Sequence, residues 1–112
     1  MKRKILLEER IQPNALESIS RFHEKTVSEV INTVSKNKVV VVGMSVNPVV
    51  KKAKKLLQSK ESEFTYLEYG SYIKGWQKRL AIKLWSGWPT YPQVFIDGKL
   101  VGGFSELKSH LK

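Results

Sequence analysis

The spacing of hydrophobic residues predicts two helices before the first strand. From Asn14 to Phe22 the apolar residues recur at helical spacing. Thr26 and Glu29 then have the three-residue spacing of a capping box, in which two residues satisfy each other's backbone N–H groups at a helix start. A second helix should therefore begin here and end near Ser35. The chain before Asn14 has only a weak pattern, compatible with an arm or an edge strand.

The strongest local pattern is VVVVGMSVNPVVKKAKKLL, residues 39–57. Four successive β-branched residues are typical of a strand buried on both faces, so this strand should be central in a sheet. Asn47 is a favourable N-cap, and Pro48 suits the first helical position, where its missing N–H costs no hydrogen bond. The helix that starts there places its apolar residues on one face and its lysines on the other.

A second strand and a third helix follow. Residues 64–69 alternate in the manner of a strand, which should run parallel to the first because a helix separates the two. Gly70-Ser71 should open the next helix, which ends near Ser86-Gly87. Trp76 is expected in the core. One face of this helix carries Ile73, Trp76, Leu80 and Leu84.

The C-terminal part predicts a hairpin and a short final helix. Residues 88–92 contain two prolines and cannot be helical, because a residue before proline is pushed towards extended conformations. A strand at 94–96, a turn at Asp97-Gly98 and a strand at 100–101 should form an antiparallel hairpin. Ser105 starts the last helix. The order of elements predicts an α/β fold with a four-stranded mixed sheet flanked by helices.

Composition narrows the class of protein. The chain has 112 residues and fits one compact domain. It has no apolar run near the roughly 20 residues that span a bilayer and no secretory signal, so we expect a cytoplasmic protein without a membrane partner. The absence of cysteine excludes disulfides, thiolate metal ligands and thiol catalysis. His23 and His110 are isolated, so no metal is expected.

The formal net charge of +10, from 20 Lys plus Arg against 10 Asp plus Glu, favours anionic partners. Most of the excess is lysine on predicted helix faces, where charges are usually solvated. Because the sequence also lacks a nucleic-acid motif, nucleic acid is a disfavoured partner.

Two stretches carry a specific resemblance, namely residues 39–57 above and WPTYPQVFIDGKLVGGFSEL. Together they resemble the glutaredoxin family of the thioredoxin fold. The second stretch is most similar to monothiol glutaredoxins, where Trp-Pro-Thr-x-Pro-Gln leads into a strand, an Asp-Gly-type turn and a Gly-Gly pair. The resemblance implies a glutaredoxin-like domain at residues 38–112, preceded by an N-terminal helical extension at 1–37.

The resemblance places Asn47 at the position of the family's catalytic cysteine and Val50 at that of the second cysteine in dithiol members. An amide is neither a thiolate nor a leaving group. The sequence therefore predicts no catalytic residue, no thiol exchange and no cysteine ligand for an iron-sulfur cluster.

The resemblance also implies a groove for glutathione built from backbone and charge. Arg79 and Lys83 match residues that bind the glycine carboxylate, and the pair before the hairpin matches the family's cis-proline turn. Two positions depart from the family, since Ser105 replaces a frequent Asp and Met44-Ser45 replaces a lysine-bearing loop. Each feature also has a structural explanation as a cap, a fixed turn or a solvated charge. The predicted ligand-binding residues are Arg79, Lys83, Thr90, Tyr91, Pro92, Gly103, Phe104 and Ser105, with Trp85 and Trp88 expected nearby.

Three functions remain open. The first is a glutaredoxin-related protein that has lost thiol chemistry and binds glutathione, or a thiol-bearing or extended-peptide partner, in a redox or iron-sulfur context. The second is the family's own glutathione-dependent thiol-disulfide oxidoreductase or electron-carrier activity, against which the missing cysteine argues. The third is a basic adaptor for nucleic acid or an acidic protein. A homodimer is compatible with all three.

Overall fold

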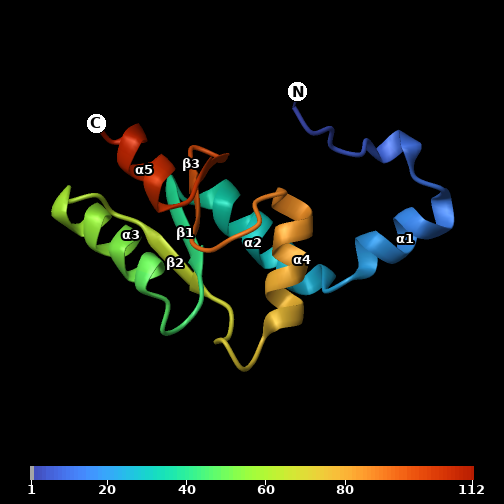
Figure 1. Cartoon of the computed structure of the whole chain (residues 1–112), viewed down its shortest axis with the longest axis horizontal. Coiled ribbons are helices and arrows are strands. Elements are labelled where there is room, and N and C mark those ends of the chain that lie inside the picture. The colour runs from blue at the N-terminus through green and yellow to red at the C-terminus, as the bar shows by residue number, and fades with distance from the viewer. Residues whose placement is uncertain (1) are drawn as a thin grey trace.

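The computed structural model describes residues 2–112, which form a four-stranded sheet with helices on both faces (Figure 1). The fold class predicted from the sequence is therefore confirmed. The helical elements are η1 (Glu8–Arg10), α1 (Pro13–Arg21), α2 (Glu24–Lys36), α3 (Pro48–Ser59), α4 (Trp76–Ser86) and α5 (Phe104–His110). The strands are β1 (Val39–Gly43), β2 (Thr65–Glu68), β3 (Gln93–Ile96) and β4 (Lys99–Gly102).

The strand order is β2-β1-β3-β4, with β1 parallel to β2 and antiparallel to β3. β1 is buried along its whole length, as its run of β-branched residues predicts. β3 and β4 form the predicted antiparallel hairpin. Asp97 and Gly98 both have positive φ, which is the backbone conformation that tight hairpin turns require.

The side chains of β1 alternate between two hydrophobic clusters, one on each face of the sheet. Val40 and Val42 pack with residues of α2 and α4, whereas Val39 and Val41 pack with residues of α3 and α5. Figure 1 shows the same division, with α3 and α5 on one side of the strands and α2 and α4 on the other. Gly43, the last residue of β1, lets α3 pack closely on the strand. A Cβ at this position would lie 2.7 Å from Cγ1 of Val50, which is too close for any other residue.

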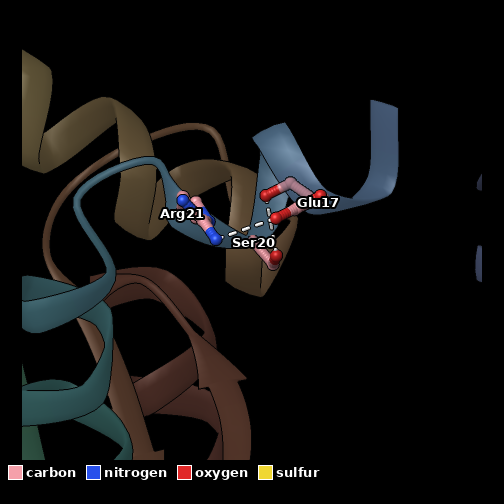
Figure 2. Close-up of polar contacts among 3 residues, drawn as sticks. All are labelled: Glu17, Ser20 and Arg21. Carbon is pink, nitrogen blue, oxygen red and sulfur yellow. Dashed lines mark hydrogen bonds and ion pairs between the residues drawn. The ribbon is translucent and has the colours of Figure 1, made fainter. Parts of the chain in front are cut away.

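Helix α1 extends away from the sheet in Figure 1. Among residues 2–29 no side chain is buried, and the first core residue is Val30 of α2. Figure 2 shows the polar contacts within α1, where Arg21 pairs with Glu17 at 2.8 Å and the Ser20 hydroxyl donates to the Glu17 carbonyl oxygen at 2.9 Å. Such exposed pairs stabilise a helix by about 0.2–0.5 kcal/mol, so α1 gains little from its own contacts.

Helix α2 packs differently from α1. Val30 and Val34 lie in the same cluster as Val40 and Val42 of the central strand. The domain boundary after residue 37 stays a prediction, but the burial of these two valines ties α2 to the sheet.

The predicted start of α2, with Thr26 as the N-cap, is wrong by three residues. The helix begins at Glu24, and its N-cap is His23, which has a left-handed backbone and makes no capping bond with its side chain. Thr26 therefore lies inside the helix and cannot form the expected capping box with Glu29, whose carboxylate accepts a hydrogen bond from the Tyr69 hydroxyl. A contact between residues distant in sequence has therefore replaced the local one.

The predicted start of α4 is also wrong. Residues 70–75 form a loop, and the helix begins at Trp76. Arg79 closes this loop, because its Nη1 donates to the carbonyl oxygens of Tyr69 at 3.0 Å and Lys74 at 2.9 Å. Gly70 and Gly75 both have positive φ, and a Cβ on either would lie 2.9 Å from the Cα of the other. The two glycines therefore permit a turn that other residues could not adopt without strain.

The inward face of α4 differs from the one predicted. The buried residues are Arg79, Ala81 and Ile82, whereas Trp76 is 57% exposed and Leu84 is 65% exposed. The guanidinium bonds of Arg79 fix the rotation of the helix, and this rotation turns the apolar stripe outward. The prediction of Trp76 in the core is therefore wrong.

No helix within residues 2–112 combines the length and the apolar character needed to cross a bilayer.

We expect Ile82→Ala and Leu84→Ala to differ sharply in stability. Ile82 is fully buried, so its truncation should lower the free energy of unfolding by about 2–5 kcal/mol. The same truncation at the exposed Leu84 should change it by no more than about 0.5 kcal/mol in dilute solution. Urea unfolding followed by circular dichroism measures both values. A larger loss at Leu84 than at Ile82 would contradict the rotation of α4 described above.

Candidate functional site

Three loops meet at the end of the sheet that holds the carboxyl terminus of β1. Val42 pairs with Gln93 in the antiparallel β1–β3 register, so the loop after Gly43 lies beside the turn that precedes β3. The loop after β2 joins them, because both the backbone N–H and the hydroxyl of Ser45 donate to the Gly70 carbonyl oxygen, at 2.9 and 3.1 Å. This end of the sheet carries Asn47 and the Tyr91–Pro92 turn.

Asn47 caps α3. Its Oδ1 accepts hydrogen bonds from the backbone N–H groups of Val49 at 2.9 Å and Val50 at 3.0 Å. The first N–H groups of a helix are the groups that stabilise an anion at this position, and here the Asn47 side chain satisfies two of them. The side chain of Val50 is buried against Gly43. The start of α3 is therefore capped by Asn47, and Val50 belongs to the hydrophobic core.

The Tyr91–Pro92 peptide bond is cis, and both residues are buried. The Tyr91 hydroxyl donates to the Arg79 carbonyl oxygen at 2.6 Å. Burial raises the pKa of Tyr91, and the nearby Arg79 charge opposes that rise only in part. Tyr91 is therefore a neutral hydroxyl donor at neutral pH, and its hydrogen bond ties the turn to α4. Thr90, which precedes it, is exposed.

Lys83 lies on the α4 side of this turn, with its Nζ 5.6 Å from the centroid of the Tyr91 ring. It is half-buried, so its charge is held near the turn and still reaches solvent. Arg79 is different, since it is only 8% exposed and its Nη1 donates to two backbone carbonyl groups. Its binding role stays a prediction, and its structural role is clear from these bonds.

Gly103 lies on the other side of the turn. A Cβ on this residue would be 3.5 Å from the Pro92 carbonyl oxygen and 3.5 Å from Nε1 of Trp88. Its backbone N–H donates to Oε1 of Glu106 at 3.1 Å, so the α5 start uses this donor internally. The Trp88 indole N–H is buried and has no hydrogen-bond partner within the described part of the chain.

The remaining predicted residues lie at the start of α5. Phe104 is half-buried and packs against the cluster under α3 and α5. Ser105 is exposed and borders a cavity of about 820 Å³ that also involves Glu106 and His110. The structure thus gathers Lys83, Tyr91, Pro92 and Gly103 around one turn, while Ser105 also faces a cavity beside β4. The ligand-binding role of all these residues stays a prediction.

Sequence reasoning missed the residue that holds this turn in place. Gln93 is fully buried, and its Oε1 accepts from the Ser86 hydroxyl at 2.7 Å while its Nε2 donates to the Trp88 carbonyl oxygen at 2.9 Å. The Ser86 oxygen in turn accepts from the Trp88 backbone N–H at 3.1 Å. A single amide thus links the end of α4 to the start of β3. The available signal was a glutamine at the head of an apolar strand, where only a satisfied polar group is tolerated.

No cluster of three or more His, Cys, Asp or Glu side chains within residues 2–112 could hold a metal ion.

Comparison with known proteins gives one consistent family. The model of the glutaredoxin family matches residues 39–101. A glutaredoxin-like protein of Dictyostelium discoideum is 51% identical over 85 residues, which cover 76% of this chain and 69% of that protein. The structure of a mutated buckwheat glutaredoxin is similar with a TM-score of 0.69 and 25% identity, over 79% of this chain and 81% of that one. A buckwheat glutaredoxin–glutathione complex is similar in fold, with a TM-score of 0.66, 23% identity and the same coverage.

We expect Asn47→Ala to destabilise the protein by about 1 kcal/mol, because the N–H groups of Val49 and Val50 lose their acceptor. Asn47→Asp is the matched control, since aspartate is an equally good cap and carries the same acceptor oxygen. Its free energy of unfolding should stay within about 0.5 kcal/mol of the natural protein. Equal stabilities of the Ala and Asp variants in urea unfolding would show that the cap contributes nothing.

Proposed function

This chain belongs to the glutaredoxin family, and we propose that it is a cysteine-free member that binds glutathione, or an extended thiol-bearing peptide, without exchanging thiols itself. The setting we propose is a redox or iron-sulfur process in which the partner supplies the sulfur. The glutaredoxin-like domain at residues 38–112 would hold this site, with residues 1–37 as an added segment. A cytoplasmic location is part of the same proposal.

The cap formed by Asn47 is the observation that carries the proposal. A nucleophilic thiol at a helix start is activated because the free N–H groups and the helix dipole stabilise its thiolate. Here the amide oxygen of Asn47 accepts hydrogen bonds from those N–H groups, and the amide is neither a nucleophile nor a leaving group. Catalysis of the family's kind has therefore lost its reacting atom, whereas the cis Tyr91–Pro92 turn beside it is present.

Binding does not need that atom. A loop that pairs with an extended ligand does so through backbone hydrogen bonds, and selectivity comes from a few charges around it. The cis Tyr91–Pro92 turn supplies such a loop, and the Tyr91 and Gln93 hydrogen bonds hold it in position. Lys83 supplies a cation beside the turn for a ligand carboxylate.

Two other functions keep a specific observation in their favour. The family match favours glutathione-dependent oxidoreduction, which here requires that a partner protein provides every thiol. The net charge of +10 favours a basic adaptor. An adaptor for nucleic acid would bind an oligonucleotide with an affinity that falls steeply as salt rises, and fluorescence anisotropy would detect it.

Titration with reduced glutathione tests the proposal most directly. We expect the amide resonances of Tyr91, Gly103 and Ser105 to shift in NMR spectra of the labelled protein, with a dissociation constant of about 1 mM or lower. If these resonances do not move with ligand at roughly ten times that concentration, the binding proposal is wrong.

Lys83→Ala should weaken this binding by roughly 2- to 5-fold, which is the contribution of a partly exposed ion pair. Lys55→Ala is the matched control, because it removes the same charge from the exposed face of α3. The same titration measures both variants. Equal losses in the two would mean that net charge, and not the position of Lys83, governs the affinity.

Asn47→Cys should restore the missing chemistry in part. A thiol at the start of α3 should have a pKa below the usual value of about 8.5, because the helix start favours its thiolate. Ser59→Cys, at the last residue of the same helix, is the control and should keep a pKa near or above about 8.5. Absorbance of the thiolate against pH measures both values.

In the presence of reduced glutathione, the Asn47→Cys thiol should also reduce a glutathione mixed disulfide by taking up the glutathionyl group, which a second glutathione then removes as glutathione disulfide, whereas the natural protein and Ser59→Cys should give no turnover. Equal pKa values in the two variants, without turnover in either, would contradict the view that one absent atom accounts for the loss of activity.

A further inference from the structure

Helix α4 exposes an apolar stripe that no other part of residues 2–112 covers. Trp76, Leu80 and Leu84 follow one another at four-residue spacing and therefore lie on one face. They are 57%, 37% and 65% exposed, while Arg79 and Ile82 on the inner side are buried. Contiguous apolar surface of this kind marks interaction sites on soluble proteins.

Helix α1 carries a matching face. Ile19 is 54% exposed, Phe22 is also exposed, and Leu16 is half-buried one turn earlier. A nine-residue helix is too short to be stable in water by itself, so α1 requires a surface to pack on. The preceding residues 5–7 add three more exposed apolar side chains.

We propose that α1 of one copy of this chain packs on the exposed face of α4 of a second copy, and that the second copy does the same in return. Each chain offers both halves of the contact, which is the condition for a closed two-fold dimer. Only Phe22 and His23 separate α1 from α2, and this short connection directs α1 away from the body (Figure 1). The geometry therefore favours the α4 of a neighbour over that of the same chain.

The charges around α1 and on α4 also favour contact between these two helices. Glu17 and Arg21 of α1 pair with each other, and the residues on either side of α1 add Glu8, Glu9 and Glu24 against Arg10, so residues 8–24 carry a small acidic excess within a chain of net charge +10. Residues 74–83 hold three lysines that reach solvent, Lys74, Lys78 and Lys83, and no carboxylate. Two copies repel one another through most faces, but a meeting of these two segments is attractive. Hydrophobic and electrostatic complementarity thus point to one contact.

Disulfide trapping between two variants tests this contact, and the absence of natural cysteine makes every introduced thiol unique. Ile19→Cys and Leu84→Cys are prepared separately, mixed and mildly oxidised. We expect a covalent pair at twice the mass of 12.9 kDa, and mass spectrometry should identify the peptides around residues 19 and 84 as the linked ones. Ser18→Cys replaces Ile19→Cys in the matched control and should give a markedly lower yield, because residue 18 lies about 100° around the helix.

Light scattering on the full chain gives an independent measurement. The natural protein should approach 25.8 kDa, twice its mass of 12.9 kDa, as its concentration rises. Ile19→Glu and Leu84→Glu should each remain at 12.9 kDa with unchanged circular dichroism, because both side chains are exposed within one copy.

Three results would overturn the proposal. The first is a natural protein that stays monomeric at every concentration tested. The second is a doubly substituted chain, Ile19→Cys with Leu84→Cys, that forms its disulfide within one copy, since α1 would then cover its own α4. The third is a dimer that survives both glutamate variants, since it would use another face.

Discussion

Burial of β1 on both faces is the constraint on which the other elements depend. A strand with Val at four successive positions must be covered twice, and the alternation of its side chains decides what each helix covers. Helices α3 and α5 pack against one set, and α2 and α4 against the other. The glycine that ends the strand lets α3 approach closely, because a Cβ there would overlap Val50. The start of α3 is thereby fixed at the end of the sheet where the Tyr91–Pro92 turn also lies.

At that corner, local stability and chemical reactivity compete for the same backbone groups. The N–H groups that begin α3 can donate to a thiolate or to a capping side chain, and here they donate to Oδ1 of Asn47. The exchange removes a costly feature, since a thiolate must be maintained by its surroundings, whereas an asparagine cap stabilises the helix directly. The asparagine therefore stabilises the start of α3 through the same two N–H groups that would otherwise be available to an anion.

The parts of the fold that could be predicted from sequence are those specified by neighbouring residues. Strand β1, the capped start of α3 and the Asp97-Gly98 turn each depend on a few adjacent side chains, and all three were predicted correctly. The failures concern contacts between distant residues. Glu29 bonds to Tyr69 instead of capping α2, and Arg79 holds the loop before α4 and turns Trp76 outward. The spacing of residues within one helix does not indicate such hydrogen bonds.

The candidate site shows the same division. The family resemblance located the Asn47 corner and the cis turn, because both have short sequence signatures. It could not show that Arg79, which the resemblance predicted as a ligand-binding residue, donates to two backbone carbonyl groups and is almost fully buried. The resemblance also did not indicate the role of Gln93, whose side-chain amide links the end of α4 to the start of β3. Both side chains hydrogen-bond to backbone carbonyl groups of the loops around the turn, so the chain itself holds these loops in place. Of the two cations on this side of α4, Arg79 is occupied by backbone carbonyl groups, whereas Lys83 remains half-exposed beside the Tyr91 ring, so any charge that this end of the sheet presents to solvent comes from Lys83.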